Sequence, residues 1–126
     1  MVTWILWALI LAMLAWMGFN YLRIRRAAKI VDNEEFEALI RTGQLIDLRD
    51  PAEFHRKHIL GARNIPSSQL KTSLAALHKD KPVLLYENQR AQRVTNAALY
   101  LKKQGFSEIY ILSYGLDSWK GKVKTS

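Results

Sequence analysis

The residues best placed to carry chemistry lie in the stretch PVLLYENQRAQR, residues 82–93. An apolar run that ends at Tyr86 leads into a polar segment and then a helical pattern, which predicts a strand, a loop and a helix. In a parallel sheet such a loop gathers backbone N–H groups and the positive end of a helix dipole, so it favours negative charge. Glu87, directly after the strand, is a carboxylate at the place where such a loop usually keeps a nucleophile or an anion.

Two structural interpretations of Glu87 are open, and we prefer both to a catalytic role. In the first, the carboxylate points into the loop and is held by backbone amides and by Arg90 or Arg93, which would lower its pKa and make it a poor general acid and a weak base. In the second, it points to solvent at the helix start, where a negative charge is mildly favourable. The candidate binding loop consists of Glu87, Asn88, Gln89, Arg90, Ala91, Gln92 and Arg93.

The two arginines of this loop have two interpretations as well. Guanidinium groups pair bidentately with phosphate and with carboxylate, so Arg90 and Arg93 are candidates for recognising an anion or an acidic group of a partner. The alternative is a pair of exposed arginines near a helix start, which contribute little.

The sequence contains no cysteine, which excludes disulfides, thiolate metal sites and thiol-based catalysis in this chain. His55 and His58 are three residues apart and can face one way, but no third ligand of matching geometry accompanies them. We therefore expect neither a metal nor a cofactor.

The net charge of +8 is concentrated at two short flanks. Residues 23–29 and residues 120–124 hold seven of the 19 basic residues, which leaves 12 basic against 11 acidic residues elsewhere. A nucleic-acid-binding face needs basic residues clustered along the folded domain, so we expect no nucleic-acid partner.

The elements that position the loop alternate between strands and helices. KIV, QLIDLR, PVLLY and IYIL are short apolar runs typical of strands. Between the first two runs, Asp32 and Glu35 form a capping-box pattern that predicts the start of a helix, and Gly43 predicts its end. Between the last two runs, RVTNAALYLKKQG has its apolar residues at helical spacing, which predicts a second helix that ends at Gly105. This alternation predicts an α/β domain with a parallel sheet flanked by helices.

An uncharged run precedes this domain at residues 2–19. As a helix it spans roughly 27 Å at 1.5 Å per residue, close to the hydrocarbon thickness of a bilayer. The alternatives are a signal peptide, which needs basic residues before its apolar part, and a core helix, which needs a polar face. Because neither feature is present, we predict one N-terminal transmembrane helix (1–22), a basic juxtamembrane linker (23–28) and an α/β domain (29–126).

The basic residues that follow the apolar run predict the orientation of the chain. A flank rich in Lys and Arg stays in the cytoplasm, so RIRRAAK at residues 23–29 predicts a single-pass protein of the cell membrane. Residues 2–22 are expected to contact the lipid bilayer, with the N-terminus outside and the domain in the cytoplasm.

Several spaced motifs resemble single-domain rhodanese-like proteins. LIDLRDPAEFHRKHILGARNIP, residues 45–66, looks like that family's Asp-x-Arg strand end, acidic-Phe turn and His-Ile-x-Gly-Ala segment, and KKQGFSEIYILSYGLDSWKG, residues 102–121, looks like its Gly-Phe, strand, glycine turn and Trp. The resemblance covers residues 29–122 and implies the rhodanese-like fold. The structural motif residues it implies are Asp47, Arg49, His58, Gly61 and Trp119, with His58 as a residue that orients the loop and Asp47 and Arg49 as residues that tie down adjoining loops.

The active-site loop departs from that family at each key position. The family pattern is Cys-x-x-Gly-x-Arg, in which the cysteine carries a sulfane sulfur as a persulfide. Aligned on Tyr86, this chain has Glu87, Arg90 and Gln92 at those places, with Arg93 one residue later. A carboxylate cannot hold a sulfane sulfur, so sulfur transfer and the related phosphatase chemistry should both be absent.

We therefore expect a membrane-anchored rhodanese-like domain that is not an enzyme and acts as a cytoplasmic binding or scaffolding module for a protein partner at the membrane. One alternative is an anion-sensing or enzymatic domain that uses the remodelled loop. Another is a domain that only supports a membrane complex assembled through the transmembrane helix.

Overall fold

A five-stranded parallel sheet forms the centre of the domain in the computed structural model, which describes residues 2–88 and 92–125, without the side chains of residues 23–27. The strand order is β1-β6-β5-β2-β4, and every neighbouring pair is parallel, so the predicted α/β class is confirmed. The strands are β1 Lys29–Val31, β2 Gln44–Asp47, β4 Arg63–Asn64, β5 Val83–Tyr86 and β6 Ile109–Leu112.

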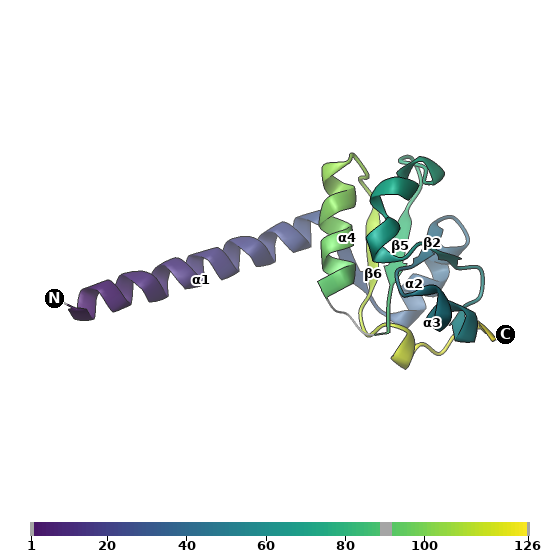
Figure 1. Cartoon of the computed structure of the whole chain (residues 1–126), viewed down its shortest axis with the longest axis horizontal. Coiled ribbons are helices and arrows are strands. Elements are labelled where there is room, and N and C mark those ends of the chain that lie inside the picture. The colour runs from purple at the N-terminus through teal and green to yellow at the C-terminus, as the bar shows by residue number, and fades with distance from the viewer. Residues whose placement is uncertain (1, 89–91, 126) are drawn as a thin grey trace.

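Helices cover both faces of the sheet (Figure 1). The three α-helices of the domain are α2 Asn33–Ile40, α3 Pro51–Arg56 and α4 Gln92–Lys103. The short 3-10 helices are η1 Ser67–Gln69, η2 Lys71–Ala76 and η3 Leu116–Ser118. The apolar stripe of α4 packs into the core on one face, and Phe36 of α2 packs into the core on the other.

Strand β5 lies in the middle of the sheet and is buried along its whole length. Its side chains alternate between the two faces, as the pleat of a strand requires. Val83 and Leu85 join the core under α4, whereas Leu84 and Tyr86 join the core under α2. The carboxyl end of this strand therefore positions the loop that begins at Glu87.

The helix boundaries follow the signals read from the sequence. The Asp32 side chain accepts the backbone N–H of Glu35 at 2.9 Å, which satisfies an unpaired donor in the first turn of α2. Helix α4 is followed by Gly105 at φ +100°, a left-handed conformation that favours glycine.

Helix α1 Val2–Ala27 precedes the sheet and projects away from it (Figure 1). By length and composition its segment Val2–Leu22 can cross a membrane, with a mean hydropathy of 2.0 and no burial within the protein. The helix continues through Ala27, so most of the predicted juxtamembrane linker, residues 23–28, is helical.

Two further strands form a second, smaller sheet. Val123–Thr125 form strand β7, which pairs antiparallel with β3 Lys57–Ile59. Backbone hydrogen bonds hold this basic segment, because they form whatever the charge of the side chains.

Candidate functional site

The candidate site lies where β2 and β5 end side by side. Asp47 at the end of β2 is in register with Tyr86 at the end of β5. Because the strands are parallel, the residues that follow them, including Arg49 and Glu87, leave the sheet at the same edge.

A buried ion pair forms the base of the site. The Arg49 guanidinium donates to the Asp47 carboxylate from Nε to Oδ1 at 3.0 Å and from Nη2 to Oδ2 at 2.8 Å. The Arg49 side chain is 5% exposed and that of Asp47 is fully buried. Such a bidentate pair fixes the orientation of both groups.

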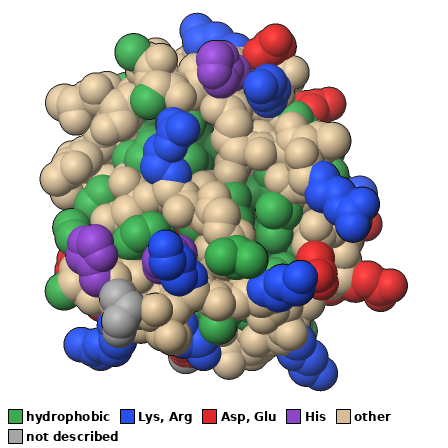
Figure 2. Space-filling model, turned by 90° about the vertical axis from the view of Figure 1, so that its right-hand side faces the viewer, with side chains coloured by type: hydrophobic (Ala, Val, Ile, Leu, Met, Phe, Trp, Pro, Cys, Tyr) green, Lys and Arg blue, Asp and Glu red, His purple; other side chains and the backbone are tan. Residues whose placement is uncertain are grey.

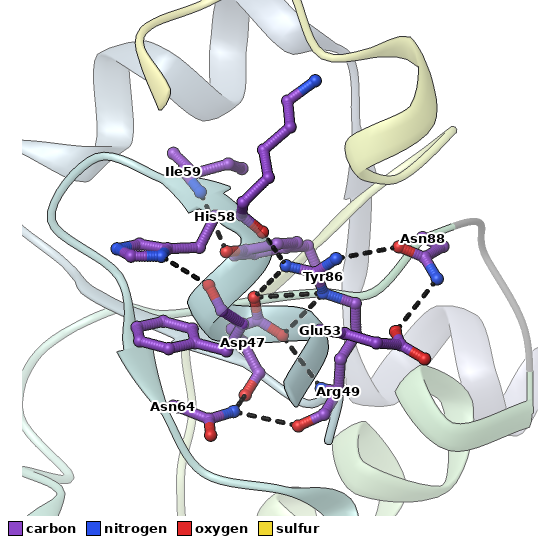
Figure 3. A network of polar contacts seen from close by, with 10 residues as sticks. Asp47, Arg49, Glu53, His58, Ile59, Asn64, Tyr86 and Asn88 are labelled. Carbon is purple, nitrogen blue, oxygen red and sulfur yellow. Dashed lines mark hydrogen bonds and ion pairs between the residues drawn. The ribbon is translucent and has the colours of Figure 1, made fainter. Parts of the chain in front are cut away.

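The rest of the Arg49 guanidinium joins the ion pair to the loop (Figure 3). Its Nη1 donates to Asn88 Oδ1 at 3.0 Å, and its Nη2 donates to the Lys57 carbonyl oxygen. Asn88 Nδ2 in turn donates to Glu53 Oε2 at 3.1 Å. Arg49 therefore joins the end of β2 to the start of the loop and to β3.

Tyr86 connects the same network to β3. Its hydroxyl oxygen accepts the Ile59 backbone N–H at 3.1 Å, and the Arg49 Cζ lies 5.9 Å from the centroid of its ring. Burial raises the pKa of Tyr86 above its ordinary value, and the negative charge of Asp47 raises it further. The phenol therefore stays protonated and serves as a structural contact.

Glu87 points into the protein and holds the start of α4. The residue is only 8% exposed, and its Oε2 accepts the backbone N–H of Val94 at 2.9 Å. A carboxylate here satisfies one of the helix N–H groups that have no partner within the helix. The protein thus supplies its own acceptor oxygen for this helix N–H group.

The predicted direction of the Glu87 pKa was wrong. Its pKa is raised, because burial outweighs the Val94 hydrogen bond and the nearby positive charge of Arg93, which both act to lower it. The sequence showed the arginines beside Glu87 but not how deeply the fold buries the carboxylate.

The raised pKa of Glu87 predicts that part of the unfolding free energy depends on pH, and Glu87→Gln should remove that part. A raised pKa in the folded state gives stability that is present at acid pH and is lost as the pH rises through that pKa. Glutamine keeps an oxygen for Val94 but carries no charge, so we expect the variant to be more stable than the parent at neutral pH, with a difference that shrinks toward pH 4.5, the ordinary value for Glu. Urea unfolding of the full chain in non-ionic detergent at several pH values measures this, and a difference independent of pH would contradict it.

A glycine turn locks the backbone of the first two loop residues. Leu116 and Asp117 donate their backbone N–H groups to the carbonyl oxygens of Glu87 and Asn88, at 2.8 and 3.0 Å. This approach requires Gly115, which has φ +69° and whose missing Cβ would overlap the same two carbonyl groups. Residues far apart in the chain thus define the start of the loop.

An open cleft of about 550 Å³ lies against this network. The buried Arg49 and its partner Asn88 line it, and its rim carries the exposed Arg56 and Lys57. The full lining consists of Arg49, Glu53, Arg56, Lys57, Asn88, Leu116 and Asp117.

The structure separates the other predicted loop residues from this cleft. Gln92 donates from Nε2 to Asn96 Oδ1 at 2.9 Å, along α4, and Arg93 is exposed on that helix. Gln89, Arg90 and Ala91 lie outside the described residues, so the two interpretations of Arg90 stay open.

The remaining motif residues serve the fold. The His58 ring stacks on Phe54 with centroids 3.8 Å apart, and its Nδ1 lies 2.8 Å from the Phe54 carbonyl oxygen, so this contact fixes α3 against β3. Gly61 has φ +92° in a turn, and Trp119 packs edge-on against Phe36. Among the described residues, no group of three or more His, Asp or Glu side chains is arranged to hold a metal ion.

Sequence reasoning missed the cleft residues Glu53, Arg56 and Lys57. They belong to the acidic-Phe turn, which was used only as a fold motif. Their relation to the loop depends on the Glu53–Asn88 contact across 35 residues of sequence, which no local pattern reveals.

Comparisons with known proteins give matches that agree with one another. A family model described as a rhodanese-like domain matches residues 32–122. The protein YqhL of Bacillus subtilis is 47% identical over 113 residues, which cover 90% of this chain and 89% of that protein. The thiosulfate sulfurtransferase GlpE of Stutzerimonas stutzeri is 36% identical over 95 residues, which cover 73% of this chain and 84% of that protein.

A solved structure shows the same fold. The rhodanese-related protein from Thermoplasma volcanium superposes with a TM-score of 0.70 at 23% identity, covering 78% of this chain and 99% of that one. The fold that the spaced motifs predicted is therefore confirmed.

Proposed function

Because this chain belongs to the rhodanese-like domain family, we propose that it is a membrane-anchored, catalytically inactive member whose cytoplasmic domain binds a protein partner. The observation that carries the proposal is the position of Glu87. At the place of the family's sulfur carrier, the chain has a buried carboxylate that is bonded to the backbone N–H of Val94.

The chemistry of the loop supports the loss of sulfur transfer. The chain has no cysteine to form a persulfide, and an oxygen acid cannot replace one. The Glu87 carboxylate also accepts a hydrogen bond from a helix N–H group that could otherwise donate to a bound anion. The relatives that are thiosulfate sulfurtransferases thus share the scaffold with this chain, whereas the reactive atom is missing here.

The cleft supports protein binding at the same edge of the sheet. Its base is held rigid by the Asp47–Arg49 pair, and Arg56 and Lys57 at its rim favour acidic side chains of a partner. Tyr114, which is 70% exposed, directly precedes the turn that supplies Leu116 and Asp117 to the cleft. Exposed aromatic residues are enriched in protein interfaces.

Membrane anchoring is the second part of the proposal. Val2–Leu22 is long and apolar enough to span a bilayer, and none of its apolar window is buried inside the described part of the protein. The basic residues of segment 23–29 favour a cytoplasmic position for the domain. A partner would then be recruited close to the membrane surface.

We expect the full chain in detergent to transfer no sulfur from thiosulfate to cyanide above the rate in buffer. The assay needs a control enzyme in the same detergent, for which a thiosulfate sulfurtransferase is suitable. Clear turnover by this chain, or labile sulfur bound to it after incubation with thiosulfate, would refute the inactive assignment.

Site-specific photocrosslinking in membranes tests the binding surface. A photoreactive residue in place of Tyr114 should capture a partner. The same residue in place of Arg41, which is exposed at the C-terminal end of α2 and outside the cleft lining, should not capture it. Reversing the rim charges with Arg56→Glu and Lys57→Glu should abolish the capture. Equal capture from both positions, or capture that survives the charge reversal, would show that the cleft is not the binding surface.

A small anion is the second candidate ligand, because three basic residues line one cleft. In that case phosphate or sulfate should raise the melting temperature of the full chain, and Arg56→Ala with Lys57→Ala should remove the shift. A shift that persists in this double variant would exclude the cleft as the anion site.

A further inference from the structure

Helix α4, beside which α1 enters the domain, is positively charged. The sequence of α4, Gln92–Lys103, contains Arg93, Lys102 and Lys103 and no Asp or Glu. All three basic side chains are exposed. Lys71 adds a fourth charge beside the helix, since its Nζ lies 5.6 Å from the centroid of the Tyr100 ring.

Helix α4 is also close to the end of the proposed membrane span. The end of α1 that joins the domain packs beside α4, and Figure 1 shows α4 running across the direction of α1. From Leu22 to Ala27 the continuing helix adds only about 8 Å at 1.5 Å per residue. A helix with its side chains is about 10 Å across, so the outer side of α4 reaches the level of the lipid headgroups.

The opposite side of the domain has a different charge pattern. Figure 2 shows that face, where Lys and Arg side chains are accompanied by Asp and Glu. Helix α3, which lies on that side in Figure 1, carries Glu53 next to Arg56. Helix α4, by contrast, carries basic residues and no Asp or Glu.

A cleft of about 340 Å³ opens along this same helix. Arg93 and Lys71 line it together with the hydroxyl groups of Ser67 and Ser68. Cationic groups next to hydroxyl donors match the phosphate of a phospholipid headgroup.

From this arrangement we propose that α4 and the cleft beside it dock on the anionic headgroups of the bilayer. The inference rests on the membrane anchoring proposed above and adds a fixed orientation of the domain. With α4 against the membrane, the cleft lined by Arg49, Asn88 and residues of α3 stays open to the cytoplasm. Docking therefore presents the partner-binding surface rather than covering it.

The absence of cysteine allows a direct test with the full chain. Asn96→Cys, exposed on α4, and Ala52→Cys, exposed on α3, each take a single fluorophore. The labelled chains are reconstituted into vesicles that carry a quencher on a lipid headgroup, made of phosphatidylcholine with or without phosphatidylserine. We expect phosphatidylserine to increase quenching at position 96 and not at position 52, with a loss of the increase at high salt.

The charge dependence is measured with Arg93→Gln, Lys102→Gln and Lys103→Gln in the Asn96→Cys background. Each removed charge should lower the ratio of docked to free domain about fivefold, so the triple variant should lose the response to phosphatidylserine. Circular dichroism verifies that the variants are folded. Quenching at position 96 that is the same in both lipids, or unchanged in the triple variant, would overturn the docking inference.

Flotation of the same samples separates this inference from the proposed function. A chain that floats with phosphatidylcholine vesicles but shows no response to phosphatidylserine is anchored without docking, which overturns the docking inference alone. A chain that floats with neither vesicle overturns the anchor and the docking together.

Discussion

Replacing Arg49 with alanine is expected to lower the free energy of unfolding by about 3–5 kcal/mol, because the change leaves the Asp47 carboxylate buried without a partner. The variant also loses the hydrogen bonds from the guanidinium to Asn88 and to the Lys57 carbonyl oxygen. Urea unfolding of the full chain in non-ionic detergent, followed by circular dichroism, measures the change. The loop and α3 should become mobile, so partner capture at the cleft should be lost as well.

Two controls isolate the buried pair. Arg41→Ala removes an exposed arginine and should change the free energy of unfolding by less than about 0.5 kcal/mol. In a double-mutant cycle, Asp47→Ala with Arg49→Ala should cost clearly less than the sum of the two single changes, because neither charge is then left unpaired. Additive single effects would show that the two groups are not coupled.

Gly115→Ala is the second change with a large expected effect. At φ +69° a side chain costs about 1–2 kcal/mol, and overpacking against the Glu87 and Asn88 carbonyl groups adds about 1–3 kcal/mol. The total expected loss is about 2–5 kcal/mol of unfolding free energy. Relief of the overlap must move η3 away from the loop, so the hydrogen bonds from Leu116 and Asp117 should break.

Gly61→Ala is the matched control for this change. Gly61 also has a positive φ, +92°, but nothing lies within 4 Å of an added Cβ. It should therefore show only the conformational cost of about 1–2 kcal/mol. If the two variants lose the same unfolding free energy, contact with the loop carbonyl groups does not contribute to the loss in Gly115→Ala. Amide hydrogen exchange at Leu116 and Asp117 provides a second measurement, because faster exchange is expected only in Gly115→Ala.

The family's scaffold is retained in this protein around a loop that begins with Glu87. The scaffold matches the family over residues 32–122, and its structural motif residues form the contacts that hold the sheet edge together. Where the resemblance implies a sulfur-carrying cysteine at the start of the loop, this chain has Glu87. The binding role proposed above depends on the site rather than on the fold, since function belongs to the site.

Some features were predictable because they depend on neighbouring residues. The Asp32 cap of α2, the apolar face of α4 and its end at Gly105 were all visible as local patterns, and the structure has each of them. Alternating strands and helices then imposed parallel pairing, because a strand–helix–strand unit returns the chain in the same direction. The apolar run before the domain likewise predicted a helix long enough to span a bilayer, and α1 is that helix.

Other features required contacts between distant residues. The cleft combines α3, the start of the loop and η3, which meet only because β2 and β5 end side by side. The C-terminal tail became a strand because β3 offered it backbone partners.

The sequence by itself determined the α/β class, the family and the missing nucleophile, because each depends on residue identity and short-range spacing. Only the tertiary structure decided that Glu87 is buried, that its carboxylate binds the Val94 N–H and that its pKa is raised rather than lowered. The physical reason is desolvation: the sequence shows which charges are near one another along the chain, whereas the loss of water around a carboxylate depends on everything that packs against it.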